Sequence, residues 1–321
     1  MLISLPKTQE KPFHPAHNFP RSRFLLACLL ITASFFATGC NFPVRHVPKL
    51  ASGQLSGMCY RAYNENVARD ISYLPHATKS QRLDIYMTKE PGLSPVFVFI
   101  HGGSWITGSR TQYGMLGRVL SEQGIVTVTV DYRLNPEVTY PAFMKDCDAA
   151  LSWVIEHIQN YGGDPQRVFL AGHSAGAHIA ALMLVHDQFR QAGAFDTQSL
   201  AGAVLMSGAY EFGEDIGVDD ELVRRVMNTP ENYLDAQPIR HTRGDVPPIL
   251  IIQGTEDKVT GKTQASKFAQ AMKDKGADIH YATIPKGDHL TVLIDMLPGE
   301  KGETYKRIVE FLQERSDSGN N

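Results

Sequence analysis

The chain has few cysteines, no excess of charge of either sign, and no block of Lys or Arg. Only 4 of its 321 residues are cysteine, and no two of them have the spacing of zinc ligands. The 31 basic and 34 acidic residues give a formal net charge of -3, which argues against a nucleic-acid-binding surface. The 12 histidines are dispersed, and none lies in a His-Glu-x-x-His pattern. We therefore expect no metal, no other cofactor and no nucleic-acid partner.

Strand patterns and helical patterns alternate along most of the chain. Short apolar runs predict buried strands at 95–100, 125–130, 167–171, 201–207, 248–252 and 281–285, after antiparallel opening strands at 67–73 and 81–87. Helices are predicted at 143–160, 175–186, 261–275 and 304–314. Such alternation indicates an α/β fold with a mostly parallel, doubly wound sheet. The polar segment 210–245 interrupts the alternation, and we expect it to form a small cap over the carboxyl edge of the sheet.

A serine between two glycines separates the strand predicted at 167–171 from the helix predicted at 175–186. Residues 172–176 read Gly-His-Ser-Ala-Gly, and the glycines allow both a tight turn and a close approach of substrate. The five-residue pattern alone is common in ordinary turns. Its place between a strand and a helix is typical of the nucleophile elbow, so it predicts Ser174 as the nucleophile.

A second glycine-rich turn follows the strand predicted at 95–100. Residues 101–105 read His-Gly-Gly-Ser-Trp. Acyl transfer places negative charge on an oxygen, and a glycine-rich turn can direct backbone N–H groups at that oxygen. By itself the segment also fits an ordinary turn with a tryptophan packed beside it, but the two motifs together fit one reaction.

An acid and then a histidine follow on loops after two later strands. The strand predicted at 248–252 leads to Asp257, and the strand predicted at 281–285 leads to His289. The resulting order Ser, Asp, His is that of the α/β-hydrolase fold and differs from the chymotrypsin and subtilisin orders.

The chain resembles α/β-hydrolase esterases that carry an HGG-x-W motif. This group includes hormone-sensitive-lipase-like carboxylesterases, isoprenylcysteine methylesterase-like proteins and kynurenine formamidase. The resemblance covers residues 60–314 and rests on motifs at 83–86, 101–105, 131–134, 162–165, 172–178, 254–257 and 288–289. Residues 174–178, Ser-Ala-Gly-Ala-His, are most similar to the methylesterase and formamidase branches. These motifs are specific for the fold and the catalytic type, and not for the substrate.

The resemblance implies a serine hydrolase that forms an acyl-enzyme intermediate. Ser174 would attack the carbonyl carbon, His289 would accept and return the proton, and Asp257 would orient His289. Backbone N–H groups would bind the oxyanion, and the resemblance places this oxyanion hole at Gly102, Gly103, Ser104 and Ala175.

Several neighbouring residues are alternatives for these roles. Glu256 and Asp288 are rival acids, and His280 is a rival base that lies inside or just before a strand. Three further histidines are expected to brace or pack around the site and not to touch substrate: His101, His173 and His178.

The N-terminal segment has the features of a bacterial lipoprotein signal peptide. Arg21 and Arg23 precede an apolar stretch at 24–36, which is shorter than the about 20 residues that cross a bilayer. Small residues then lead to Cys40, as in a lipobox, where the cysteine is diacylated and becomes the mature N-terminus. We expect an exported protein anchored to a membrane through Cys40 and facing the periplasm or cell surface. A plain secretory signal and an uncleaved anchor are the alternatives.

The other cysteines leave one pairing open. Cys28 lies in the expected leader, whereas Cys59 and Cys147 remain in a compartment that permits disulfides. Cys147 falls on the apolar face of the helix predicted at 143–160, which favours a buried thiol.

One catalytic domain is expected. The signal peptide takes residues 1–39, a tether 40–59, the α/β-hydrolase domain 60–316 and a polar tail 317–321. Without the leader about 280 residues remain, which is the size of a single α/β domain.

Three functions fit these observations. The first is a serine carboxylesterase that hydrolyses small or aryl acyl esters. The second is an arylformamidase with the same triad. The third is a noncatalytic hydrolase-fold binding protein, which the presence of all three triad residue types disfavours. Segment 210–245 is short and acidic, and it shows no apolar face suited to a lipid interface, so we expect a preference for short acyl chains.

Overall fold

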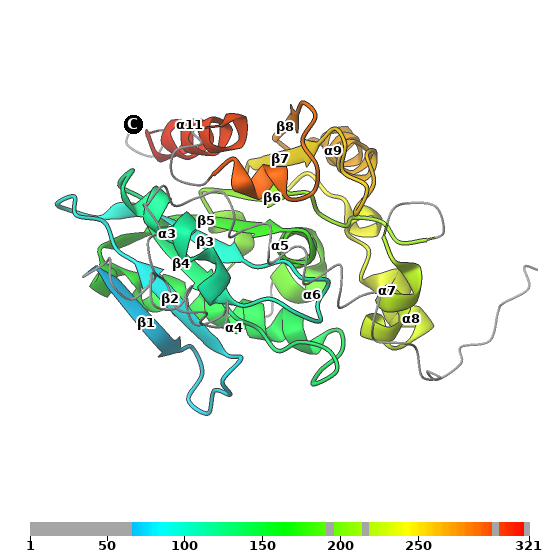
Figure 1. The fold of residues 1–321 in the computed structure, drawn as a ribbon, viewed down its shortest axis with the longest axis horizontal. Helices are drawn as coiled ribbons and strands as arrows, with labels where there is room; N and C mark the ends of the chain where they lie inside the picture. Colours follow the sequence, from blue (N-terminus) through cyan, green and yellow to red (C-terminus); the bar gives the residue numbers. More distant parts are fainter. Residues whose placement is uncertain (1–65, 191–195, 214–217, 297–301, 318–321) are drawn as a thin grey trace, which may run out of the picture. The chain divides into compact units, whose positions relative to one another are not determined.

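An eight-stranded sheet forms the centre of the computed structural model, which describes residues 66–190, 196–213, 218–296 and 302–317 (Figure 1). The strand order is β1-β2-β4-β3-β5-β6-β7-β8. The strands are β1 (Val67–Ser72), β2 (Arg82–Tyr86), β3 (Ser94–Ile100), β4 (Val126–Val130), β5 (Gly163–His173), β6 (Gly202–Met206), β7 (Ile249–Gly254) and β8 (Ile279–Ile284). The pairs β1–β2 and β2–β4 are antiparallel, and the other pairs are parallel. The predicted mostly parallel sheet with antiparallel opening strands is confirmed.

Helices cover both faces of the sheet. The helices are α3 (Gly114–Ser121), α4 (Ala142–His157), α5 (Ala175–Val185), α6 (Asp187–Arg190), α7 (Asp220–Met227), α8 (Pro230–Asp235), α9 (Gln264–Asp274), α10 (Thr291–Ile294) and α11 (Glu303–Asp317). Short 3-10 turns are η1 (Arg110–Tyr113), η2 (Ile158–Tyr161), η3 (Thr197–Ser199) and η4 (Pro238–His241). None of the described helices is long and apolar enough to cross a bilayer.

Strand β3 shows how the two faces are built. Side chains alternate between the faces of a sheet, so Val96 and Val98 pack into one core with α4, α5 and α9. Phe97 and Phe99 point the other way and pack with α3, α10 and α11. Because both faces are buried, strands such as β3 read as continuous apolar runs, which is why the sequence reveals them.

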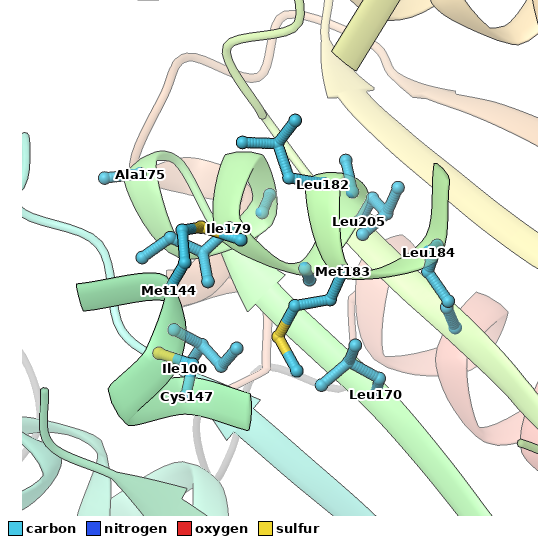
Figure 2. Packing of buried hydrophobic residues seen from close by; sticks show 14 of the residues in the cluster. Ile100, Met144, Cys147, Leu170, Ala175, Ile179, Leu182, Met183, Leu184 and Leu205 are labelled. Atoms are coloured by element: carbon cyan, nitrogen blue, oxygen red, sulfur yellow. The ribbon is translucent and has the colours of Figure 1, made fainter. Parts of the chain in front are cut away.

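Helix α5 is buried along its whole length. Figure 2 shows Ile179 and Met183 of α5 in one cluster with Met144 and Cys147 of α4. A helix that is apolar on all sides suits such an enclosed position. Since close-packed interiors resist displacement, α5 gives Ser174, the residue just before it, a fixed support. Cys147 is a free, buried thiol, and burial raises its pKa well above the usual range.

Helix α3 is an element that the sequence patterns did not reveal. It contains two glycines, which are poor helix formers, so its local signal is weak. Its apolar side chains Leu116, Val119 and Leu120 are nevertheless buried against the sheet. Tertiary burial therefore stabilises this helix more than its local propensity does.

The expected cap segment contains α7, α8 and η4, with residues 214–217 outside the described part. Side chains cap the two helices, because Asp219 accepts from the Leu222 N–H and Thr229 from the Asn232 N–H. The sequence analysis expected no apolar face suited to a lipid interface in this segment, and the apolar face of helix α7 is not free for such an interface. That face, formed by Val223, Val226 and Met227, is turned inward and fully buried.

The predicted signal peptide, the tether, Cys40 and Cys59 lie outside the described residues, as do residues 318–321 of the polar tail. All of the described residues belong to one unit of the chain, Tyr60–Asn321.

Candidate active site

Ser174 stands on a strained turn between β5 and α5. Its backbone has φ 56° and ψ −119°, a conformation that residues other than glycine rarely adopt. The flanking glycines are required by space, since a Cβ on Gly176 would lie 2.0 Å from the Ile100 carbonyl oxygen. A Cβ on Gly172 would lie 2.3 Å from the Gly176 backbone. The local sequence therefore permits a turn that presents the serine at the end of β5.

Asp257 and His289 form a hydrogen-bonded pair. His289 Nδ1 lies 2.9 Å from Asp257 Oδ2. A carboxylate only accepts, so the proton is on Nδ1 when the ring is neutral, and Nε2 keeps a lone pair that can take a proton. Asp257 follows β7 and is fully buried, whereas His289 follows β8. Parallel neighbouring strands thus bring together two residues that are 32 positions apart in the chain.

Hydrogen bonds hold Asp257 in its ionised form. Burial acts to raise the pKa of this carboxyl, but the hydrogen bond and charge of His289 and the backbone N–H groups of Val259 and Thr260 lower it well below its usual range. Gln253 Nε2 and the Thr260 hydroxyl also donate to Asp257 Oδ2, at 2.8 Å and 3.1 Å. The carboxylate is therefore both charged and fixed in orientation.

The rival residues have other partners. Glu256 is exposed and pairs with Lys262, and Asp288 accepts from Leu290 and Thr291 on its own loop. His280 lies within β8 and contacts Arg315 and Asp278. Of these candidates, the structure places Asp257 alone in hydrogen-bond contact with His289.

His173 connects the serine turn to the histidine loop. Its Nε2 lies 2.8 Å from the His289 carbonyl oxygen, and the two rings lie 4.7 Å apart. Among the described residues no hydrogen bond joins the Ser174 hydroxyl to His289, whose Nδ1 is paired with Asp257. The structure thus places Ser174 next to the residue that holds the histidine loop.

The turn at 101–105 lies against the serine. A Cβ on Gly102 would be 3.1 Å from Ser174 Cβ, so glycine allows the close approach. Ser104 and Trp105 have φ values of 53° and 59°, and Gly103 has φ 118°. Among the described residues, the backbone N–H groups of Gly103, Ser104 and Ala175 donate to no protein acceptor. They are therefore available to a ligand oxygen.

His101 braces this turn, as the sequence analysis expected. Its Nδ1 lies 2.7 Å from the Gly102 carbonyl oxygen, and its ring stacks on Tyr132 with centroids 4.4 Å apart. The Tyr132 hydroxyl also donates to the His101 carbonyl oxygen. Burial lowers the pKa of His101, so the ring stays neutral in this enclosed position.

His186, Asp235 and His241 form a group that no sequence motif reveals. Their potential metal-ligating atoms lie within 4.8 Å of one another, although the residues are too far apart in the chain to form a motif. The Gln188 N–H donates to His186 Nδ1, which puts the proton on Nε2, and Nε2 lies 2.9 Å from Asp235 Oδ1. His241 Nε2 lies 2.7 Å from the Asp235 carbonyl oxygen. These hydrogen bonds occupy both nitrogens of His186, so the group binds the cap to the body of the protein.

Comparison with known proteins places the chain in a family. The BD-FAE family model matches residues 83–272. A probable isoprenylcysteine alpha-carbonyl methylesterase of Arabidopsis thaliana is 28% identical over 86% of this chain and 61% of its own length. Esterase LipQ of Mycobacterium tuberculosis is 32% identical over 68% of this chain and 56% of its own length. The chain thus spans about three fifths of the length of these curated relatives.

A solved structure agrees with the fold. The propionate-bound esterase Est2 of Thermogutta terrifontis superposes with a TM-score of 0.61, at 24% identity over 77% of this chain and 92% of that one. The eight-stranded sheet, the strained serine turn and the family match lead to one assignment. The chain belongs to the BD-FAE family and has the α/β-hydrolase fold of the esterases that it resembles.

Proposed function

We propose that the protein is a serine carboxylesterase with Ser174 as nucleophile, His289 as base and Asp257 as the orienting acid. The observation that carries the proposal is the hydrogen bond between Asp257 and His289, together with a serine on a strained turn whose chain neighbour, His173, contacts His289. The esterase names of the relatives support it. The strained backbone of Ser174, directly after the end of β5, also supports the proposal, since residues with strained backbone cluster at functional sites.

The proposed mechanism uses the protonation state described above. Neutral His289 takes the Ser174 proton at Nε2 while Ser174 Oγ attacks the carbonyl carbon of the ester. The charge of Asp257 stabilises the imidazolium that forms, and the proton then passes to the leaving alcohol. Water repeats the sequence on the acyl-enzyme and releases the acid.

The backbone N–H groups of Gly103, Ser104 and Ala175 bind the oxyanion in this mechanism. They have no protein acceptor among the described residues, so they require no rearrangement when charge develops. Gly102 contributes the close approach to Ser174, and its carbonyl oxygen is held by His101.

We further propose a preference for small or aryl acyl groups. The apolar face of α7 is buried, and Asp235 is tied to the body through Tyr140 and His186, at 2.7 Å and 2.9 Å. A cap anchored in this way offers no free apolar face to a lipid surface. Propionate in the Thermogutta esterase is consistent with a short acyl group.

An arylformamidase would use the same groups, and a noncatalytic binding protein would need none of them. The test is a panel of nitrophenyl esters of increasing chain length, assayed beside N-formylkynurenine, together with labelling by a fluorophosphonate. We expect faster turnover of acetate and butyrate than of long-chain esters, and labelling at Ser174. Faster turnover of N-formylkynurenine would favour the formamidase, and absence of labelling at Ser174 would contradict the enzyme proposal.

We also propose that the protein is a membrane-anchored lipoprotein. The support is the sequence alone, in which an apolar stretch ends at Cys40. Cys40→Ala expressed in a Gram-negative host should shift from the membrane fraction toward soluble or unprocessed material. Wild-type protein that is already soluble in the periplasm would contradict the anchor.

A further inference from the structure

His178 connects two segments that are far apart in the chain. Trp105 Nε1 donates to His178 Nδ1 at 3.3 Å, and His178 Nε2 lies 2.7 Å from the carbonyl oxygen of Ala236. An indole nitrogen only donates, so His178 Nδ1 is the acceptor. Nε2 therefore carries the proton and donates a hydrogen bond to the Ala236 carbonyl oxygen. One neutral tautomer satisfies both contacts.

The surroundings keep His178 in that neutral form. The side chain is fully buried, and burial lowers its pKa to about 4, although the hydrogen bond to the Ala236 carbonyl opposes this shift. Around neutral pH the lone pair on Nδ1 is therefore available to the indole. The Trp105 ring also meets the His178 ring edge-on, with centroids 4.9 Å apart.

At one end of this connection lies the turn that presents the proposed oxyanion donors. Ser104 and Trp105 both have left-handed backbone, which is unfavourable outside glycine and needs contacts to hold it. The Trp105 carbonyl oxygen accepts from the Asn135 N–H at 2.9 Å, and its side chain is fixed by His178. Holding Trp105 therefore holds the adjoining Ser104 N–H.

At the other end lies the cap. Ala236 is buried and directly follows Asp235, whose carboxylate receives hydrogen bonds from Tyr140 and His186. His241 fixes the Asp235 carbonyl oxygen at 2.7 Å. The carbonyl of Ala236 is consequently held in place relative to the body of the protein.

We propose that His178 is a positioning residue. It contacts the cap at Ala236 and the turn at 101–105 through Trp105, so the position of the cap determines the geometry of the backbone N–H groups of that turn. The effect on rate rests on the proposed esterase function, whereas the connection itself does not. His178 touches neither the reacting atoms nor Ser174 Oγ in this account. It acts through Trp105, and Asp235 acts through His178.

The first experiment reads the indole directly. The chain has 2 tryptophans, so the nitrogen-15 spectrum should contain two indole resonances, which Trp153→Phe assigns. His178→Phe keeps an aromatic ring but loses both hydrogen bonds, and it should shift the Trp105 resonance. His178→Gln can accept and donate at similar positions, so it should restore part of the shift. His157→Phe is the matched control, because His157 stacks on Trp153 at 4.6 Å and should move that resonance alone.

The second experiment reads the rate. His178→Phe should lower kcat about 10- to 100-fold with less than about a threefold change in KM, because misplaced oxyanion donors weaken transition-state binding and leave substrate binding intact. His178→Gln should recover part of kcat, and His157→Phe should leave it unchanged. A loss confined to KM, or no loss in kcat, would overturn the positioning role.

The third experiment tests the connection to the cap. Asp235→Ala should shift the Trp105 resonance when His178 is present and cause no further shift when it is combined with His178→Phe. Equal shifts in both backgrounds, or an unmoved Trp105 resonance in His178→Phe, would overturn the connection. If the wild-type protein hydrolyses no ester, the proposed function fails, yet the indole spectra still decide whether His178 links the cap to the turn.

Discussion

His173 Nε2 donates to the backbone carbonyl oxygen of His289 at 2.8 Å, so the residue before the proposed nucleophile holds the loop of the proposed base. Burial lowers the pKa of His173 to about 3, and the neighbouring charge of His289 acts in the same direction. His173 therefore stays neutral and keeps the proton on Nε2 that the carbonyl accepts. The serine turn and the histidine loop are positioned as one unit.

Loss of that hydrogen bond should lower the rate. His173→Phe keeps a ring in the buried site but cannot donate, and we expect kcat to fall about tenfold with a smaller change in KM, because the base is less well positioned. His173→Gln, which can donate, should retain more activity. His280→Phe is the control, since His280 lies in β8 and contacts Arg315 and Asp278. Equal kcat for all three variants and the wild type would contradict this role.

Substitutions in the triad should act as one unit. Ser174→Ala and His289→Ala should each lower kcat by about 10⁴-fold or more, and the double variant by little beyond that. Asp257→Asn should cost a similar or somewhat smaller factor, since the base stays but loses its orientation. Glu256→Gln and Asp288→Asn are matched controls and should remain active. An active Asp257→Asn beside an inactive Glu256→Gln would show that the acid is Glu256.

Gly172 and Gly176, which flank Ser174, have no space for a Cβ atom, whereas other glycines are required only by a positive φ angle. An alanine at Gly176 would place its Cβ 2.0 Å from the Ile100 carbonyl oxygen at the end of β3, so α5 and β3 would have to move apart. We expect Gly176→Ala to lower the free energy of unfolding by more than about 3 kcal/mol, or to prevent folding. Gly162→Ala is the control, because that site is open and only its φ of 79° is unfavourable. It should cost about 1 kcal/mol in urea unfolding. Equal costs would refute the steric argument.

Two buried histidines should make the folded state less stable in acid. Burial lowers the pKa of His173 to about 3 and that of His178 to about 4, from an ordinary value of 6.5. Between the pKa of each histidine in the folded state and 6.5, that histidine binds a proton in the unfolded chain but not in the folded chain. The free energy of unfolding is therefore highest above pH 6.5 and decreases as the pH falls, by about 1.6 kcal/mol for each histidine between pH 6.5 and pH 5.

Urea unfolding at several pH values measures this effect. His178→Gln removes one of these groups and should reduce the slope of stability against pH by the contribution of one histidine, at most about 1.4 kcal/mol per pH unit, while the other buried histidines still contribute. A wild-type slope near zero between pH 5 and pH 7 would show that these histidines are not buried in neutral form.

Local sequence was sufficient for the strands and for the residue types of the site. The runs that become β3, β5 and β7 are apolar because both faces of the sheet are covered, so their pattern survives without any knowledge of the fold. The motif around Ser174 is equally local, since its glycines are required by contacts within the turn and with β3. Helix α3, in contrast, is stabilised by burial against the sheet and leaves little local signal.

Only the tertiary structure shows which residues far apart in the chain form hydrogen bonds with one another. Sequence order suggested Asp257 for His289, but it left Glu256 and Asp288 open, and only the fold shows which carboxylate reaches the ring. The contacts of His173 and His178 join residues 116, 73 and 58 positions apart, and no periodicity connects such positions. A hydrogen bond depends on where two loops meet in space. The sequence therefore determined which chemical groups the protein carries, and the packing of sheet, helices and cap decided which of them act on one another.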